Sequence, residues 1–220
     1  MKSKNMENPI NIEQLQRIIN LSKKSVVKIK KQNMASNTGF LCNVHFPDKK
    51  TLPILITSYH ILNENDITVG KKVNFSLDND NIFYQILIDE TRKVYSNRLY
   101  DITFIEIKKS DGLNISSFLE VDPNIFAFHD IELINKQVCL LSYHFGKELQ
   151  FSNGKIKNLG EDGYHIYHFC SSNLGCAGGP IIDLNNNHVI AVHQGAMEQK
   201  FFNIGIFLKK PLEEFDKINN

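Results

Sequence analysis

The feature that most constrains the fold of this chain is a succession of short segments rich in Val, Ile, Phe and Tyr, bounded by Asn, Asp, Gly or Lys. Segments of this length and composition predict β-strands. We expect about eleven of them, at residues 25–31, 39–46, 52–58, 72–77, 82–88, 101–107, 137–144, 164–169, 180–184, 188–195 and 201–208. Many short strands separated by turns favour an all-β barrel or sandwich over a βαβ fold.

A helix is predicted at each end of the chain. Apolar residues recur with a helical period from Ile12 to Ile19, and Asn11 before them is a suitable N-cap. Near the other end, Pro211 begins the stretch PLEEFDKI, in which proline occupies a first helical position and acidic residues follow in the first turn. We expect both helices to be short, and the N-terminal one to pack against the β domain.

Length and charge narrow the class of protein. Barrel folds of 220 residues commonly form a single unit, so we expect an N-terminal helical segment over residues 1–24 and one large domain over residues 25–220. The 25 basic and 24 acidic residues nearly cancel, which gives no overall attraction to nucleic acid or to an anionic membrane. Lys28, Lys30 and Lys31 are expected to form a solvated strand face.

The N-terminal residues and the cysteines indicate the compartment. The stretch MKSKNMENPINIEQLQ is polar and lacks the apolar core of a secretory signal. Cys42, Cys139, Cys170 and Cys176 are widely spread without a CxxC pair, and we interpret them as reduced thiols. Because Cys and His ligands are not clustered, we expect no metal site and no cofactor. These features predict a cytoplasmic protein.

Three local segments carry residues that could do chemistry. His60 directly follows an apolar strand in ITSYHIL, and Asp101 begins an apolar strand in LYDITFIEI. The third segment, SSNLGCAGGPIID, is a glycine-dense loop that leads into another apolar strand. Each segment alone is weak evidence for catalysis, because a single His after a strand is usually structural and an Asp at a strand start is usually a turn residue.

In this order, the segments resemble the chymotrypsin-like (trypsin-like) serine protease family, with some likeness to its glutamyl endopeptidases. TSYHIL resembles the segment with the catalytic His, YDITFIEI the strand led by the catalytic Asp, and GCAGGP the Gly-x-Ser-Gly-Gly-Pro nucleophile loop. TGFLCNV ahead of the His adds support. The resemblance runs from about residue 25 to residue 217, and it implies two antiparallel β-barrels at roughly 25–115 and 125–210.

The resemblance also implies catalytic roles. His60 would take a proton from the nucleophile and later donate it to the leaving amine, while Asp101 would hold the tautomer of His60. In the segment Gly175, Cys176 and Ala177, the backbone N–H groups of the first and third residues would form the oxyanion hole. Residues 178 and 179, both glycine, would let the chain pass close to the substrate.

The nucleophile itself is missing, because the residue directly before Gly-Gly-Pro is Ala177. Cys176 is a poor substitute, since the oxyanion glycine of the family lies two residues before the nucleophile and therefore pairs Gly175 with position 177. Either Ala177 is an engineered replacement of a serine, or the domain is a natural pseudoprotease. The base, the acid and the oxyanion glycine are all kept, which favours engineering.

The main interpretation is therefore a serine endopeptidase that is inactive as given. The first alternative is a pseudoprotease that holds an extended peptide in its old cleft. A second alternative is a viral 3C-like cysteine protease whose nucleophile has been replaced. A barrel that binds single-stranded nucleic acid would need a basic groove with interleaved aromatic residues, and the nearly neutral charge disfavours it.

The resemblance further implies a substrate pocket and a mode of control. His193 is similar to the His of the VIGIHxGG segment in glutamate-specific relatives, where it helps to bind an acidic or amide side chain; Glu, Asp or Gln is therefore expected before the cut bond, with an apolar residue as the alternative. The pocket would be lined by Ser171, Ser172, His193, Gln194, Gly195 and Gly205.

We expect a protein or peptide substrate and neither nucleic acid nor membrane as partner. In secreted relatives a freed N-terminus pairs with an Asp before the nucleophile, where this chain has Cys176. Control is therefore expected to come from a regulatory partner, from localisation or from the N-terminal segment.

Overall fold

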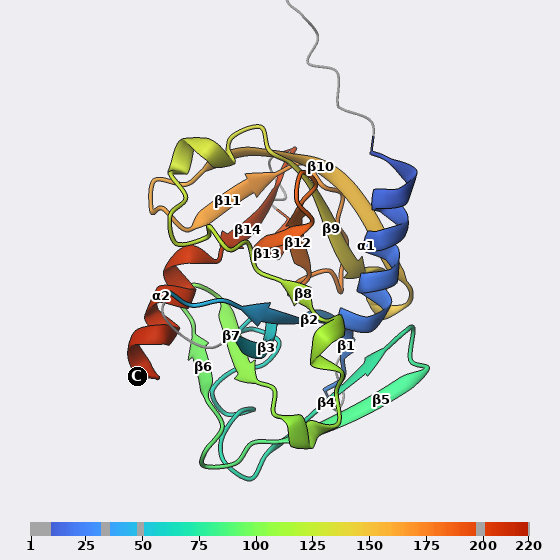
Figure 1. The fold of residues 1–220 in the computed structure, drawn as a ribbon, viewed down its shortest axis with the longest axis vertical. Coiled ribbons are helices and arrows are strands. Elements are labelled where there is room, and N and C mark those ends of the chain that lie inside the picture. The colour runs from blue at the N-terminus through green and yellow to red at the C-terminus, as the bar shows by residue number, and fades with distance from the viewer. Residues whose placement is uncertain (1–9, 32–35, 48–50, 197–200, 220) are drawn as a thin grey trace, which may run out of the picture.

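The computed structural model describes residues 10–31, 36–47, 51–196 and 201–219. Its strands form two sheets that follow one another along the chain, with the first sheet in the lower half of Figure 1 and the second in the upper half. Two α-helices, α1 (Ile12–Ser25) and α2 (Lys209–Ile218), lie on the outside. Four single turns of 3₁₀ helix lie in the connections, at Lys109–Asp111, Ile115–Ser117, Asp130–Leu133 and His144–Gly146.

The first sheet is a half-barrel. Its strands are β1 (Val26–Ile29), β2 (Asn37–Val44), β3 (Leu52–Thr57), β4 (Lys72–Leu77), β5 (Ile82–Leu87), β6 (Val94–Asn97), β7 (Ile102–Glu106) and β8 (Leu119–Glu120). They are arranged in the order β5-β4-β1-β2-β3-β7-β6, and β8 runs parallel to β2. Within the described residues, β5 and β6 are not paired with each other, so the barrel expected here is open.

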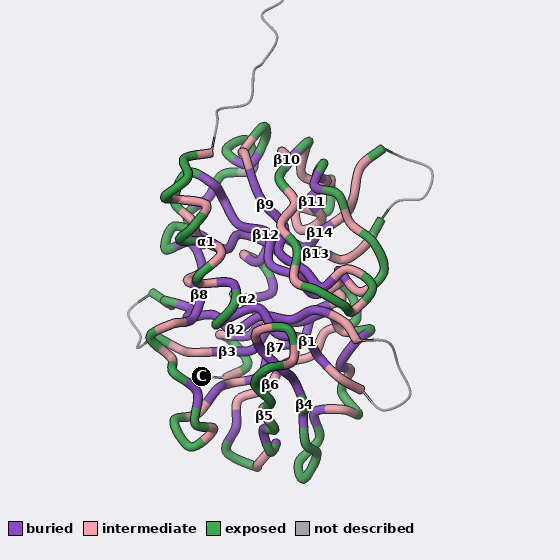
Figure 2. The backbone as a smooth tube through the Cα atoms, turned by 90° about the vertical axis from the view of Figure 1, so that its right-hand side faces the viewer, coloured by how far each residue is buried: buried purple, intermediate pink, exposed green. Residues whose placement is uncertain are grey.

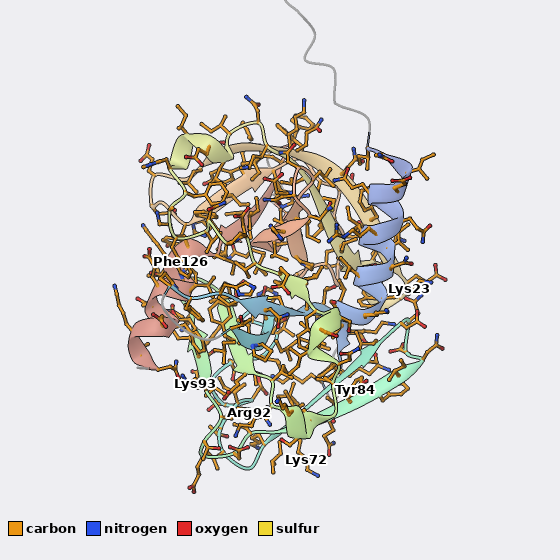
Figure 3. All side chains as sticks on the ribbon, viewed as in Figure 1. Lys23, Lys72, Tyr84, Arg92, Lys93 and Phe126 are labelled. Carbon is orange, nitrogen blue, oxygen red and sulfur yellow. The ribbon has the colours of Figure 1, made fainter. Side chains whose placement is uncertain are left out.

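A side chain bridges part of this opening. Arg92, labelled in Figure 3, donates to the carbonyl oxygen of Leu87 at 2.9 Å and to that of Glu106 at 2.7 Å. Its guanidinium also forms a 2.7 Å ion pair with Asp111, and both side chains are nearly buried. The two hydrogen bonds to carbonyl oxygens tie the end of β5 to the end of β7. The ion pair with Asp111 compensates the buried charge of Arg92.

The second sheet is a closed barrel. Its strands are β9 (Gln137–Tyr143), β10 (Leu149–Leu159), β11 (His165–His168), β12 (Pro180–Asp183), β13 (His188–Ala196) and β14 (Asn203–Phe207). All adjacent strands are antiparallel, in the order β10-β11-β14-β13-β12-β9. The loop between β11 and β12 carries the glycine-dense segment.

Each of the eleven predicted strands is present within a few residues of its predicted bounds. Three further strands, β6, β8 and β10, were not predicted. β10 has a polar sequence, LQFSNGKIKNL, and only Ile156 in it is buried. Its backbone is nevertheless paired on both sides, with β9 and β11, so closure of the barrel outweighs the weak local preference of these residues.

A helix is present at each end, as predicted, but α2 begins at Lys209, so Pro211 is its third residue and its first turn contains no acidic residue. Asn11 caps α1, its Oδ1 accepting the N–H of Glu13 at 2.9 Å, and Gln14 donates to Asn187 in the turn between β12 and β13. The aromatic ring of Phe215 in α2 packs against those of Tyr95 and Phe104. Both helices therefore cover the β domain, α1 beside β9 and α2 beside β6 and β7 (Figure 1).

Buried residues concentrate in the central strands, and exposed ones in the loops and helix surfaces (Figure 2). The expectation that Lys28 is solvated is wrong, because its residue is only 4% exposed. Its ammonium pairs with Asp80 at 2.8 Å and donates to the carbonyl oxygen of Lys147 at 2.7 Å. Partial burial opposes ionisation of Asp80, but hydrogen bonds from Lys28, Ser76 and Lys30 lower its pKa to about 2. Lys28 thus links the two sheets.

Candidate active site

His60 lies at the surface, just after the end of the buried strand β3. The strand ends at Thr57 and a tight turn follows, which leaves the His60 side chain 51% exposed. Its Nδ1 lies 2.9 Å from Oδ2 and 3.0 Å from Oδ1 of Asp101. Because a carboxylate only accepts hydrogen bonds, Nδ1 carries the proton and Nε2 is the basic nitrogen.

Asp101 is held in an uncommon backbone conformation, with a φ of 48°. Asp tolerates this left-handed region better than most residues. The turn before it is closed by Asn97, whose Oδ1 accepts the N–H of Leu99 at 2.8 Å. The carboxylate also accepts the backbone N–H of His60 at 3.0 Å. Asp101 therefore orients both the ring and the main chain of His60.

The glycines of the loop between β11 and β12 allow close packing against the protein itself. Gly175 and Gly178 have φ values of 87° and 83°. A Cβ on Gly178 would lie 2.1 Å from the carbonyl oxygen of Thr38, and one on Gly179 would lie 2.6 Å from that of Leu141. Gly178 and Gly179 are therefore required for packing against β2 and β9, and their close approach to a substrate stays a prediction.

Two backbone N–H groups of this loop remain available. The carbonyl oxygen of Leu174 accepts the N–H of Phe145 at 2.6 Å, and since the C=O and N–H of one peptide point in opposite directions, the N–H of Gly175 points away from Phe145. Within the part of the chain that the structure describes, the N–H groups of Gly175 and Ala177 donate to no protein acceptor. This is the donor pair that an oxyanion hole requires.

Cys176 lies between these donors but belongs to the interior. The residue is 0% exposed, and its Sγ accepts the N–H of Asn173 at 3.3 Å. Burial raises the pKa of its thiol, which lowers the fraction of nucleophilic thiolate. All four cysteines are unpaired and buried, as expected for reduced thiols.

A cleft of about 360 Å³ lies beside these groups. It brings together seven of the predicted site residues: His60, Ser172, Gly175, Ala177, His193, Gln194 and Gly195. Asp101 lies behind His60, outside this lining. Ser171 is exposed elsewhere, and Gly205 is buried opposite His193 in the β13–β14 pair. A Cβ on Gly205 would meet Val192 and Ile181 inside the barrel, so neither Ser171 nor Gly205 lines the cleft.

Four other lining residues were not predicted, namely Asn37, Asn173, Leu174 and Ala196. Asn173 and Leu174 stand directly before Gly175 in the sequence, so their position in the loop could have indicated that they line the cleft. Asn37 is far from the loop in sequence and gives no local signal. Leu174 is 78% exposed, which places an apolar side chain at the rim of the cleft.

His193 forms a buried pair with a histidine that the sequence did not single out. Its Nδ1 lies 3.1 Å from Nε2 of His168, and both residues are at most 1% exposed. Burial lowers the pKa of His168 to about 4. Burial first, and then the neighbouring His168, lower the pKa of His193 well below its ordinary value. Both rings are therefore neutral at pH 7.

We expect this pair to make the fold sensitive to mild acid. An unfolded His titrates near about pH 6.5, whereas folded His168 stays neutral to about pH 4. The unfolded state then binds more protons between these values, so stability is fully present above about pH 6.5 and is lost as the pH falls. His168 alone should remove about 1.6 kcal/mol of unfolding free energy between about pH 6.5 and pH 5.

Urea unfolding at these two pH values measures the effect. His168→Gln should reduce the pH dependence, while His129→Gln, at an exposed position, should leave it unchanged. An equal pH dependence in the unsubstituted chain and in His168→Gln would contradict the assignment.

The described residues contain no group of three or more His, Cys, Asp or Glu side chains placed to hold a metal ion. Among the same residues, no helix has both the length and the apolar character needed to span a bilayer.

Comparison with known proteins gives the family and the fold of the chain. A family model described as a trypsin-like peptidase domain matches residues 37–192. A search of curated proteins finds no match.

Among solved structures, the fold is similar to that of the serine endoprotease from Yersinia pestis, with a TM-score of 0.65, 14% identity, and coverage of 97% of this chain and 68% of that chain. It is also similar to the Rv3671c protease in an inactive form, with a TM-score of 0.62, 19% identity, and coverage of 99% and 100%. An inactive serine-to-alanine mutant of Rv3671c from M. tuberculosis H37Rv gives a TM-score of 0.60, 19% identity, and coverage of 97% and 96%. The expected two-barrel, chymotrypsin-like fold is confirmed, with its first barrel open.

Proposed function

Because the chain belongs to the trypsin-like peptidase family, we propose that it is a serine endopeptidase in which Ala177 replaces the nucleophilic serine. The observation that carries this proposal is the His60–Asp101 pair, which faces a loop with two unused N–H donors. A hydroxyl at position 177 is the single chemical group that the arrangement lacks.

With serine at position 177, the steps follow from the groups in place. Nε2 of His60 would accept the hydroxyl proton as the oxygen attacks the peptide carbonyl. Asp101 would stabilise the imidazolium that forms, and the N–H groups of Gly175 and residue 177 would bind the carbonyl oxygen as it gains charge. Loss of one such donor costs about 3–4 kcal/mol in related chemistry. The imidazolium would then protonate the leaving amine as the C–N bond breaks, which leaves the acyl group on the serine oxygen. Water, deprotonated by His60, would attack this ester and release the acid and the serine hydroxyl.

The neutral His193 favours a particular residue before the cut bond. Its Nδ1 faces His168, which leaves Nε2 for the cleft. Nδ1 of His168 is buried without a partner among the described residues, and since orphaned buried N–H groups are rare, we assign its proton to Nε2. His193 then accepts at Nδ1 and donates from Nε2. An uncharged donor suits an amide carbonyl, so we propose Gln ahead of Glu.

A peptide-binding pseudoprotease is the second candidate, and the methyl group of Ala177 beside an open cleft is what favours it. Such a module would hold an extended chain without cutting it. In either case we propose a protein or peptide as ligand, and the cytoplasm as the site of action.

Covalent labelling tests the proposal. The Ala177→Ser protein should react with a fluorophosphonate, gaining one phosphonyl group on the serine oxygen by intact mass, while the chain with Ala177 should not react. The double variant with His60→Ala should also stay unlabelled, because the serine then lacks its base. A folded Ala177→Ser protein that never labels would overturn the enzyme in favour of the binding module.

A further inference from the structure

Thr38 lies in β2 of the half-barrel, yet its side chain holds the loop of the other barrel. Its Oγ1 donates to the carbonyl oxygen of Gly175 at 2.7 Å and accepts the N–H of Tyr143 at 2.9 Å. Its backbone N–H donates to the carbonyl oxygen of Ala177 at 3.2 Å. One fully buried residue therefore contacts both Gly175 and Ala177, two residues that line the cleft and whose N–H groups donate to no acceptor among the described residues.

The orientation of this hydroxyl is fixed from two sides. Because Tyr143 donates to the oxygen, the single hydroxyl proton of Thr38 is directed to Gly175. The main chain of Thr38 is held in turn by Thr57, whose Oγ1 donates to its carbonyl oxygen at 2.9 Å. Thr57 ends β3, the strand that leads to His60. The same network thus connects the base to the oxyanion loop.

Among the described residues, the peptide groups around Gly175 are held by hydrogen bonds between uncharged groups, one of which joins the N–H of Cys176 to the carbonyl oxygen of Asn173 at 3.2 Å. Phe145 holds the preceding peptide through the carbonyl oxygen of Leu174, and Thr38 holds the following one through that of Gly175. The neighbouring residue is the uncharged Cys176, so no ion pair can order this segment. If the contact with Thr38 were lost, the peptide between Gly175 and Cys176 would still be held by the 3.2 Å hydrogen bond from the N–H of Cys176 to the carbonyl oxygen of Asn173. We expect this weaker restraint to leave Gly175, with its broad conformational freedom, less well ordered.

We propose that Thr38 is a positioning residue that keeps the N–H of Gly175 aimed into the cleft, a role that rests on the proposed protease function. It touches no substrate, and it acts by fixing the peptide between Gly175 and Cys176.

Kinetics of the Ala177→Ser protein test this role. Thr38→Val keeps the branched shape but removes the hydroxyl, and should lower kcat about tenfold to a hundredfold, since small misplacements of catalytic groups are costly. KM should stay nearly unchanged, because the hole acts on the transition state. Thr38→Ser should recover most of kcat. Ser25→Ala is the matched control, since Ser25 is a buried hydroxyl that donates to the carbonyl oxygen of Ser117 at 2.8 Å; it should leave kcat unchanged.

A second measurement tests the order of the loop directly. It does not require catalytic activity, so it is made on the chain with Ala177. In ¹⁵N relaxation-dispersion NMR, Thr38→Val should introduce microsecond-to-millisecond exchange at the amides of Gly175 and Cys176, and Thr38→Ser should not. The positioning role would be overturned if the amides of Gly175 and Cys176 showed no exchange in Thr38→Val. It would also be overturned if Thr38→Val and Thr38→Ser had the same kcat. If Ala177→Ser is inactive while Thr38→Val shows the exchange, the protease proposal fails and the role of Thr38 in ordering the loop stands.

Discussion

Replacing His60 by alanine in the Ala177→Ser protein is expected to lower kcat about a million-fold. Without Nε2, nothing takes the proton of the serine hydroxyl as it attacks, and nothing returns it to the leaving amine. The N–H groups of Gly175 and residue 177 would remain, so the residual rate should still exceed the rate in water, by roughly a thousandfold or more. The ratio of initial rates on one peptide substrate, with both proteins at known concentration, measures the loss.

A matched control separates catalysis from general damage. His45 is also a half-exposed His paired with a carboxylate, with Nε2 2.8 Å from Glu120, but it lies outside the cleft lining. His45→Ala should leave kcat unchanged. Equal activity in His60→Ala and His45→Ala would remove His60 from the mechanism.

Asp101→Asn in the same Ala177→Ser protein should lower kcat about ten-thousand-fold. An asparagine amide can donate to Nδ1 of His60, which moves the ring proton to Nε2 and removes the base without disturbing the fold. The loss should be smaller than that of His60→Ala, since the ring remains in place. Because His60 and Asp101 act as one unit, the double variant should be no slower than His60→Ala alone.

Asp162 provides the control for this change. It too pairs with Nδ1 of a histidine, His165, but on the outer surface of the second barrel. Asp162→Asn should keep full activity. The assignment of Asp101 would be contradicted if Asp101→Asn and Asp162→Asn had similar rates.

Much of the fold could be predicted because its signals are local. Strands such as β3 and β7 are apolar, contain β-branched residues, and are bounded by turns, so their positions follow from sequence. β10 could not be predicted, since its pairing partners rather than its residues make it a strand. The ion pair of Arg92 with Asp111, beside the open edge between β5 and β6, is likewise a contact that no periodicity reveals.

The candidate site also contains residues that local sequence indicates and residues that only the fold reveals. His60, Asp101 and Gly175 stand in short segments with a recognisable order, so the sequence alone could indicate them as candidate site residues. Thr38 and His168 act through contacts with residues distant along the chain. Their types are common in strands, and only the folded backbone shows which carbonyl or ring each one reaches.

Lys28 illustrates why burial is hard to predict. In sequence it is one of several lysines near a strand, and a solvated face is the ordinary expectation. In the fold, Asp80 comes from the turn between β4 and β5, and Lys147 from the loop before β10. A buried cation is tolerated because both partners are supplied by other segments.

The most direct test of the protease assignment is to incubate Ala177→Ser and, separately, Ala177→Cys with a diverse peptide library and to identify the cut bonds by mass spectrometry. The chain with Ala177 is the negative control, and His60→Ala in each active form is the second control. We predict cleavage by the Ser form, lost with His60→Ala, with Gln enriched directly before the cut bond. If both forms are folded and neither cuts any peptide, the chain is a peptide-binding module and the endopeptidase assignment is wrong.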